Sequence, residues 1–346
     1  MMKQIKSYVL KKLGIQSLRE KAEEGQKQVI TLQKRMNDVE KRLKDLRDVE
    51  RRLNDLTENK AELMYRVRAL EELVFLQTGG LKAEKRAQKL IVSMTSFPAR
   101  IESVSNVVKQ MMIQTVRPDE IVLWLSEEQF PEKEQQLPKE LLDLKAYGLT
   151  IGWCAGDLKA YKKFLPAMKA YPEDLIMIID DDLVYPVDFV EKLYEAHQQF
   201  PNAIIASRVH QIGLDEQGKI APYGTWKKQC GYDRYQTRSD WFFTGGAGTL
   251  FPPHIFTEGL FDEALIREIC PWADDIWLNV HAAINQVPII NTALNHKLAR
   301  IDGTQEECLQ KINWDRNEND IQLQKVVTHY REQLQNTIYA HLEIES

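Results

Sequence analysis

Three short apolar runs, separated by two segments of helical pattern, constrain the fold of this chain more than any other feature of its sequence. The runs cover residues 90–94, 120–125 and 175–179 and consist mostly of Leu, Ile, Val and Met, which is typical of strands buried on both faces. Amphipathic segments lie between them, at 104–111 and 157–170. Strands that alternate with helices at this spacing build a parallel sheet with crossover helices. The sequence therefore predicts an α/β fold. Further helices are predicted at residues 188–199, 274–284 and 320–343.

A heptad pattern occupies the chain ahead of this region. Between residues 15 and 74 apolar residues recur at spacings of three, four or seven, with one three-residue slip after Leu46, and most other positions are charged or carry amides. The apolar positions are Ile15, Leu18, Ala22, Val29, Leu32, Met36, Val39, Leu43, Leu46, Leu53, Leu56, Leu63, Val67, Leu70 and Val74. This pattern predicts an α-helical coiled coil, and hence a homo-oligomer, because a coiled coil needs a partner strand. The alternative is a single solvated helix that folds back on the globular domain.

Two features divide the chain further. Gly79 and Gly80 are expected to end the long helix, which puts a domain boundary there. Residues 1–13 carry four lysines opposite an apolar face, as in helices that lie on an anionic membrane surface; the alternative is a frayed helix start that happens to be basic. The predicted parts are a basic amphipathic helix at 1–14, a coiled-coil stalk at 15–80, an α/β domain at 88–300 and a C-terminal helical extension at 301–346.

Charge and composition exclude several classes of protein. Residues 1–89 carry a net charge of +8, whereas the remainder carries −13, so the acidic α/β region argues against a nucleic-acid partner. The four cysteines are far apart and form no zinc-binding pattern or disulfide framework. No apolar run approaches the roughly 20 residues of a membrane span. Together with the lack of a secretory signal at the N-terminus, this predicts a cytoplasmic protein.

Three consecutive aspartates, Asp180, Asp181 and Asp182, follow the third apolar run directly. Adjacent carboxylates at a buried strand end repel one another unless a positive group neutralises them. Ligands of open parallel sheets bind at the carboxyl ends of the strands. If the backbone stays extended, Asp180 and Asp182 lie on one side and Asp181 on the other, and the pair suits Mg²⁺ or Mn²⁺ with phosphate oxygens as further ligands. The alternative is a solvated acidic turn before the next helix.

Six segments of the chain, in order, resemble the GT-A glycosyltransferases that build bacterial surface polysaccharides. The resemblance spans residues 90–295, weakens beyond them and leaves the heptad region uncovered. The segments are IVSMTSFPARI (91–101), QTVRPDEIVLWLSEEQFP (114–131), KKFLPAM (162–168), IIDDDLVYP (178–186), TGGAGTLFPP (244–253) and WADDIWL (272–278). The resemblance implies a GT-A fold, which is Rossmann-like, with a mainly parallel sheet flanked by helices.

The resemblance also implies roles for the residues that would bind the donor. The acidic triplet corresponds to the family's DxD motif, so Asp180 and Asp182 would hold the divalent metal, Mn²⁺ or Mg²⁺, and Asp181 would bond the donor's ribose or sugar. The turn after the first strand, with Thr95, Ser96 and Arg100, would line the nucleoside pocket. Lys163 is the lysine best placed to reach the diphosphate, although a lysine is more often a surface residue.

The remaining site residues lie in the later segments. Asp275 would be the general base that removes the proton of the acceptor hydroxyl, with support from Asp274, although acids at a helix start are also favoured by the dipole alone. Gly245 and Gly246 would let the backbone approach the donor sugar, or simply form a turn. His296 is a candidate third metal ligand, although a lone histidine is more often structural.

The function that follows is a metal-dependent, inverting transfer of a sugar, of the hexosyltransferase kind, to a glycan or lipid-linked glycan. A UDP-sugar is the favoured donor, and the pathway would be capsule or O-antigen synthesis at the inner face of the cytoplasmic membrane. Two alternatives remain. A metal-dependent nucleotidyltransferase would need a phosphate-binding glycine loop after the first strand, where residues 95–100 have no glycine. A coiled-coil scaffold with a degenerate enzyme domain would have lost acids that are present here.

Overall fold

The structure is a computed structural model, and it describes residues 2–12, 26, 33–38, 41–42, 44, 57, 62–82, 85–231, 233–294, 298–301 and 318–343. The chain divides into two compact units, Met1–Leu70 and Glu71–Ser346. Within the described ranges, no helix is both long enough and apolar enough to span a membrane.

The described parts of the first unit are helical. The first helix, α1 (Met2–Lys12), has exposed side chains from residue 2 to residue 8. Most of the heptad positions lie outside the described residues, so the coiled coil and the oligomer stay predictions. Five heptad residues are described: Met36, Leu63, Leu70 and Val74 are exposed, and Val67 is half-buried.

A helix at residues 62–78 ends immediately before Gly79, as the sequence predicts, but its last turns belong to the α/β unit. Phe75 is 3% exposed and its ring centroid lies 4.8 Å from that of Tyr147. Lys109 bonds Glu72 at 2.8 Å. The segment at 71–78 therefore contacts the α/β core through Phe75 and Glu72, while most of its other side chains are exposed.

Seven strands form the central sheet of the second unit, in the order β11-β6-β10-β4-β1-β2-β3. β10 is antiparallel to both of its neighbours, and every other pairing is parallel. This is an α/β fold with a mainly parallel sheet, as predicted. The strands are β1 (Leu90–Thr95), β2 (Glu120–Ser126), β3 (Leu149–Cys154), β4 (Leu175–Ile178), β6 (Ile204–Ala206), β10 (Thr249–Phe251) and β11 (Ile289–Asn291).

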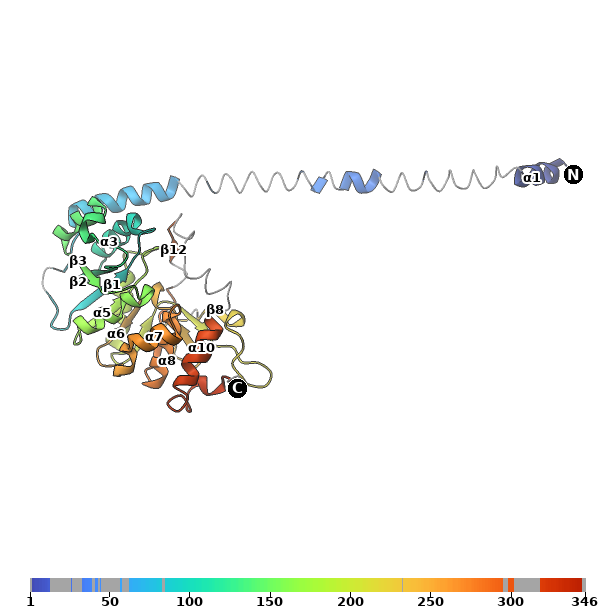
Figure 1. The fold of residues 1–346 in the computed structure, drawn as a ribbon. Helices are drawn as coiled ribbons and strands as arrows, with labels where there is room; N and C mark the ends of the chain where they lie inside the picture. The colour runs from blue at the N-terminus through green and yellow to red at the C-terminus, as the bar shows by residue number, and fades with distance from the viewer. Residues whose placement is uncertain are drawn as a thin grey trace. The chain divides into compact units, whose positions relative to one another are not determined.

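Helices cover both faces of this sheet, because successive apolar side chains of its strands point to opposite faces. One core contains Leu90, Val92 and Met94 of β1 together with residues of α3, α4 and α6, and the other contains Ile91 with residues of α5, α7, α8 and α10. Figure 1 shows α7, α8 and α10 side by side. The helices that cover the two faces are α3 (Val104–Met112), α4 (Lys139–Asp143), α5 (Leu165–Ala170), α6 (Phe189–Gln199), α7 (Glu263–Ile269), α8 (Asp274–Ile284) and α10 (Glu318–His329).

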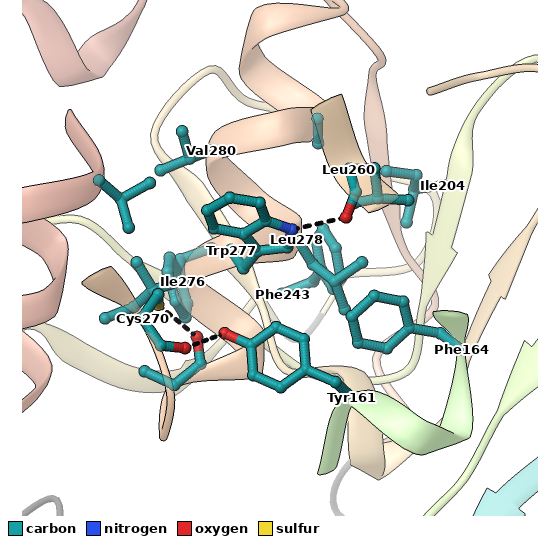
Figure 2. Packing of buried hydrophobic residues seen from close by; sticks show 14 of the residues in the cluster. Tyr161, Phe164, Ile204, Phe243, Leu260, Cys270, Ile276, Trp277, Leu278 and Val280 are labelled. Atoms are coloured by element: carbon teal, nitrogen blue, oxygen red, sulfur yellow. Dashed lines mark hydrogen bonds between the residues drawn. The ribbon is translucent and has the colours of Figure 1, made fainter. Parts of the chain in front are cut away.

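The second core fixes the position of α8, on which the candidate base lies. Trp277 of α8 is fully buried, and its indole Nε1 donates to the carbonyl of Leu260 at 2.9 Å (Figure 2). The hydroxyl of Tyr161 donates to the carbonyl of Cys270, just ahead of α8 (Figure 2). Buried polar groups that are satisfied in this way hold one geometry, because breaking either bond would strand a polar atom in the core. The start of α8 is therefore held rigidly against the sheet.

Two small sheets and several short 3₁₀ helices complete the described fold. β7 (Val209–Gln211) lies between β8 (Lys227–Cys230) and β9 (Trp241–Phe243), antiparallel to both. β5 (Leu183–Val184) pairs with β12 (Ala299–Arg300). The 3₁₀ helices are η1 (Ile101–Ser103), η2 (Lys133–Gln136), η3 (Leu144–Tyr147), η4 (Lys159–Lys163), η5 (Tyr223–Thr225), η6 (Gly245–Ala247), η7 (Glu258–Phe261) and η9 (Ile338–His341).

Two predicted helices are shorter in the structure. The helix expected at 157–170 is divided at Phe164 into η4 and α5, because Pro166 lacks a backbone donor and fits only the first turn of a helix. The helix expected at 320–343 ends at His329 and is followed by turns and η9. Cys154, Cys230 and Cys270 are free thiols, in line with the predicted lack of a disulfide framework, while Cys308 lies outside the described residues.

Candidate active site

One edge of the central sheet gathers the candidate residues. The carboxyl ends of β1, β4 and β6 lie at this edge because the three strands run in the same direction. The antiparallel β10 begins there, since Thr249 pairs with Ile178 of β4 and Ala206 of β6. The residues that follow β1, β4 and β6 and those that precede β10 are therefore neighbours. In parallel sheets this edge is where ligands bind.

Lys163 connects two carboxylates from distant parts of the chain. Its Nζ lies 3.0 Å from Oδ1 of Asp180, beyond β4, and 3.1 Å from Oδ2 of Asp274, at the start of α8. We call these three residues the Lys163 group. The lysine side chain is only 5% exposed, and its backbone carbonyl accepts a hydrogen bond from Ser93 Oγ of β1 at 2.6 Å.

The pKa values of Lys163 and Asp180 are shifted in opposite directions, and each shift favours the charged form. Burial alone would lower the pKa of Lys163, but Asp180, Asp274 and Asp275 outweigh burial and raise it. Burial alone would raise the pKa of Asp180, but Lys163 outweighs burial and the net pKa is lowered. The lysine therefore stays protonated and Asp180 stays ionised.

Arg100 joins the other two aspartates of the triplet. Its guanidinium lies 2.9 Å from Asp181 and 3.1 Å from Asp182, and Ser96 Oγ donates to Asp181 at 2.5 Å. We call these four residues the Arg100 group. Burial raises the pKa of Asp181 to about 6, although Arg100 and Ser96 both lower it. Burial is therefore the larger effect on this carboxyl.

The ion pairs divide the aspartate triplet differently from the sequence prediction. Asp180 and Asp182 were expected on one side of an extended backbone, but β4 ends at Ile178 and the chain turns at residues 181–182. As a result Asp181 and Asp182 share Arg100, whereas Asp180 contacts Lys163. The alternation was expected only for an extended backbone, and extended geometry stops before the triplet begins.

A glycine turn ahead of β10 touches both Asp180 and Asp275. The carbonyl of Gly246 accepts from the backbone N–H of Asp180 at 2.9 Å, and a Cβ at position 246 would lie 1.8 Å from Oδ2 of Asp180. The backbone N–H of Gly245 donates to Oδ1 of Asp275 at 2.8 Å. A side chain at position 246 would displace the aspartate, so the close approach requires glycine there.

Asp275 is the second residue of α8, and the pKa of its carboxyl is strongly raised. Burial, followed by the charge of Asp274, raises the pKa of Asp275 to about 7, against the lowering effect of Lys163. The amide of Asn279, one turn along α8, donates to the carbonyls of Asp275 and Phe243 at 2.7 and 2.8 Å. This arrangement gives a fixed carboxyl that exchanges a proton near neutral pH, which is what a general base requires.

The donor set fits a divalent cation only if most of the other ligands come from outside the protein. Within the described ranges, no cluster of three or more His, Cys, Asp or Glu side chains has the geometry of a metal site, and His296 lies outside those ranges. The two carboxylates proposed as ligands are those of Asp180, with a side chain 35% exposed, and Asp182, 14% exposed, and each pairs with a cation in the structure. Mg²⁺ commonly takes one or two carboxylates and completes its shell with phosphate oxygens and water. Each aspartate can supply one ligand in that mode of binding, in competition with its present partner.

Thr95, at the end of β1, and Arg208, beyond β6, also lie at this edge of the sheet. The hydroxyl of Thr95 donates to the carbonyl of Trp124 in β2 at 2.7 Å, so it holds two strands together. Arg208, which the sequence analysis did not select, lies at the same edge immediately beyond β6, and its Nε donates to Thr244 Oγ1 at 2.6 Å. The sequence does hold a signal for Arg208, because it lies shortly after the apolar run at residues 203–206. Asp180 lies in the same way just after the apolar run at residues 175–179.

Comparisons with protein-family models and with curated proteins find no match to this chain.

Proposed function

We propose that this chain is a glycosyltransferase of the GT-A type, which transfers a sugar from a nucleoside-diphosphate donor to a hydroxyl group of a glycan. The observation that carries the proposal is the meeting of two carboxylates on one glycine turn. Asp180 lies against Gly246, and Asp275 accepts a hydrogen bond from Gly245. Sugar transfer in one displacement needs a group that neutralises the leaving diphosphate and a base for the attacking hydroxyl, both close to one carbon atom. The resemblance of six sequence segments assigns these roles to the same residues.

In this proposal each part of the site has a chemical task. Asp275 takes the proton of the acceptor hydroxyl as that oxygen attacks the anomeric carbon, and the single displacement inverts the configuration. Asp180 and Asp182 would hold Mg²⁺ or Mn²⁺, which supplies a Lewis acid for the leaving diphosphate when bound. The turn with Ser96 and Arg100 would face the nucleoside. Lys163 keeps Asp180 ionised and holds the carboxylates of Asp180 and Asp274 in position.

The two alternatives have less support. A nucleotidyltransferase would cradle the triphosphate in backbone N–H groups of a glycine loop after β1, and residues 95–100 contain no glycine. A degenerate enzyme would be expected to have lost acids of the site, and Asp180, Asp182, Asp274 and Asp275 are all present. The favoured donor remains a UDP-sugar and the favoured acceptor a bacterial surface glycan, both from the family resemblance.

The experiment is a binding screen of the full-length protein. Thermal unfolding is followed with a panel of UDP-, GDP- and dTDP-sugars, each with Mn²⁺ and with a chelator. A ligand that binds only the folded state raises its stability by mass action, so we expect at least one nucleotide sugar to raise the melting temperature only when the metal is present.

Three variants make this screen specific. Asp180→Asn is expected to abolish the metal-dependent stabilisation, whereas Asp275→Asn keeps it but loses sugar transfer. Glu268→Gln replaces an exposed acid of α7 and is the matched control. If no nucleotide sugar stabilises the protein with any of Mn²⁺, Mg²⁺ or chelator, the proposal is wrong. Stabilisation by nucleoside triphosphates alone would favour the nucleotidyltransferase.

A further inference from the structure

Two cations near the active site differ from Lys163 and Arg100 in having no carboxylate partner. Arg208 follows β6, and Lys228 lies in β8. Among the residues that the structure describes, neither makes an ion pair within 4.0 Å, whereas Lys163 and Arg100 each bond two aspartates. A cation that is already paired has little capacity left for a new anion. Arg208 and Lys228 are therefore the cations with capacity for an incoming ligand.

Arg208 is anchored to the turn that holds the catalytic carboxylates. Its Nε donates to Thr244 Oγ1 at 2.6 Å, and its carbonyl accepts from the backbone N–H of Thr244 at 3.2 Å. Thr244 immediately precedes Gly245, whose N–H bonds Asp275. No described residue accepts a hydrogen bond from the terminal nitrogens of Arg208, and those nitrogens are not buried. A guanidinium fixed through Nε still offers its terminal nitrogens to a carboxylate or phosphate.

Lys228 is fixed by aromatic rings instead of by an acid. Its Nζ lies 3.4 Å from the centroid of the Tyr223 ring and 5.6 Å from that of Trp226, and it donates to the carbonyl of Tyr223 at 2.8 Å. Burial lowers the pKa of Lys228 to about 8, although Asp320 and Asp275 raise it. A lysine held in this way keeps further N–H donors and loses part of its water shell, which strengthens its attraction for an anion.

His210 lies close to both cations without neutralising either. It belongs to β7, next to β8, and its Nδ1 accepts from the backbone N–H of Gln229 at 3.1 Å. Burial, with the charges of Lys228 and Arg208, lowers the pKa of His210 to about 4. Its ring is therefore uncharged at neutral pH and lies near an unneutralised pair.

We propose that Arg208 and Lys228 form an anion-binding subsite for the acceptor, which takes a carboxylate or phosphate group of an acidic glycan. The inference rests on the proposed function. The subsite is assigned to the acceptor because the nucleoside turn follows β1, and both β4 and β10 separate β1 from β6 in the sheet. Arg208 is joined through Thr244 to the turn whose Gly245 N–H bonds Asp275, the proposed base for the acceptor hydroxyl, and Lys228 lies in the strand that pairs with β7, immediately after Arg208. Two cations there offset the repulsion that Asp274 and Asp275 exert on an acidic sugar.

The test compares sugars that differ in one charged group. Ligand-observed NMR with the full-length protein measures the binding of methyl glucuronide, glucose 6-phosphate and methyl glucoside. We expect the first two to bind and the neutral glucoside to bind at least several-fold more weakly. Arg208→Gln and Lys228→Gln should each weaken binding of the charged sugars about tenfold, as expected for a lost charge-assisted hydrogen bond. Arg234→Gln and Lys227→Gln are matched controls, because both side chains are exposed, and they should change nothing.

A second measurement separates the acceptor from the donor as the source of the anion. Metal-dependent binding of UDP should be unchanged in Arg208→Gln and Lys228→Gln if the subsite serves the acceptor. If both variants weaken UDP as much as the glucuronide, the cations bind the donor diphosphate and the acceptor assignment is overturned. Equal binding of glucuronide and glucoside to the wild type would overturn the subsite itself. Binding of glucuronide through Arg208 by a protein that binds no nucleotide would keep the subsite and reject the glycosyltransferase.

Discussion

The Lys163 group and the Arg100 group both neutralise part of one aspartate triplet, yet they are built differently. Lys163 connects the end of β4 to the start of α8, two elements about ninety residues apart, and its side chain is 5% exposed. Arg100 bonds two consecutive residues of one turn, Asp181 and Asp182, and the hydroxyl of Ser96 also donates a hydrogen bond to Asp181. The first group joins a strand end to a helix, whereas the second joins the ends of two neighbouring strands, β1 and β4.

The pKa values of the two groups follow from this difference. Lys163 and Asp180 keep their charges, since the pKa of Asp180 is lowered and that of Lys163 is raised. In the Arg100 group the pKa of Asp181 is raised to about 6, so this carboxyl can take up a proton when its neighbours are lost. Loss of Lys163 leaves two carboxylates without their cation, and Asp275 beside them. Loss of a partner in the Arg100 group should cost less free energy, because the carboxyl of Asp181 can become protonated.

The largest effect is expected for Lys163→Met. It leaves Asp180 and Asp274 facing each other near Asp275, and stranding buried charge in this way costs about 3–5 kcal/mol. Urea unfolding at pH 7 measures the loss. Lys169→Met removes an exposed lysine paired with Glu263 and should change the stability little. Similar losses in the two variants would show that the Lys163 group is not a structural joint.

The double variant Lys163→Met/Asp274→Asn sharpens this test. Removing one carboxylate together with its cation relieves the repulsion, so the double variant should recover part of the lost free energy. A double variant that is less stable than the sum of the two single changes would contradict the electrostatic explanation.

The next effect concerns Asp275, which borders the Lys163 group. Asp275→Asn keeps an oxygen that can accept the N–H of Gly245 but cannot accept a proton from substrate, so turnover should fall by about 10²-fold or more. The same substitution should raise the free energy of unfolding, although it lowers turnover. Because the pKa of Asp275 is about 7 when folded and about 3.9 when unfolded, the wild type binds the extra proton only in the folded state. Its stability therefore falls as pH rises between those two values.

As pH rises from 4 to 7, the free energy of unfolding of Asp275→Asn should increase relative to that of the wild type, by up to about 1.4 kcal/mol per pH unit. Melting temperatures of both proteins over this range check it, with Glu268→Gln as the control. A constant difference between wild type and variant would mean that the Asp275 carboxyl has an ordinary pKa, and the base would then need another assignment.

Local sequence patterns predicted the elements that place the site but not the contacts within it. β1, β2 and β4 were predicted because each lies in a nearly continuous apolar run, and α8 because its apolar residues recur at helical spacing. β3 contains Gly152, which Trp124 overlies so closely that a Cβ would lie 2.3 Å from its ring, and a glycine reads as a break in a strand. β6, β10 and β11 have three residues each, too few for any periodicity to show.

The contacts of the site depend on tertiary structure. The sequence placed Asp180 with Asp182, but a turn after β4 separates them and only the fold brings Lys163 to Asp180 and Asp274. Arg208 and Lys228 were missed because an arginine after a short strand and a lysine in an exposed hairpin look like ordinary surface residues. Their significance lies in having no acid within ion-pair distance among the described residues, which no local pattern reports.

The smallest effect is expected for Ser96→Ala in the Arg100 group. The Ser96 hydroxyl donates to the Asp181 carboxylate at 2.5 Å, so the variant should lose about 1 kcal/mol at pH 8, where that carboxyl is ionised. At pH 5 the carboxyl is mostly protonated, because its pKa is about 6, and the loss should be smaller. Ser103→Ala removes a hydroxyl that donates to the carbonyl of Arg100 at 2.9 Å. That acceptor is neutral, so the cost of Ser103→Ala should be the same at both pH values. Urea unfolding of the two variants at pH 5 and pH 8 therefore tests whether the Arg100 group relaxes by taking up a proton. A loss for Ser96→Ala that is equal at both pH values would mean that Asp181 stays ionised throughout, as Asp180 does, and the contrast between the two groups would disappear.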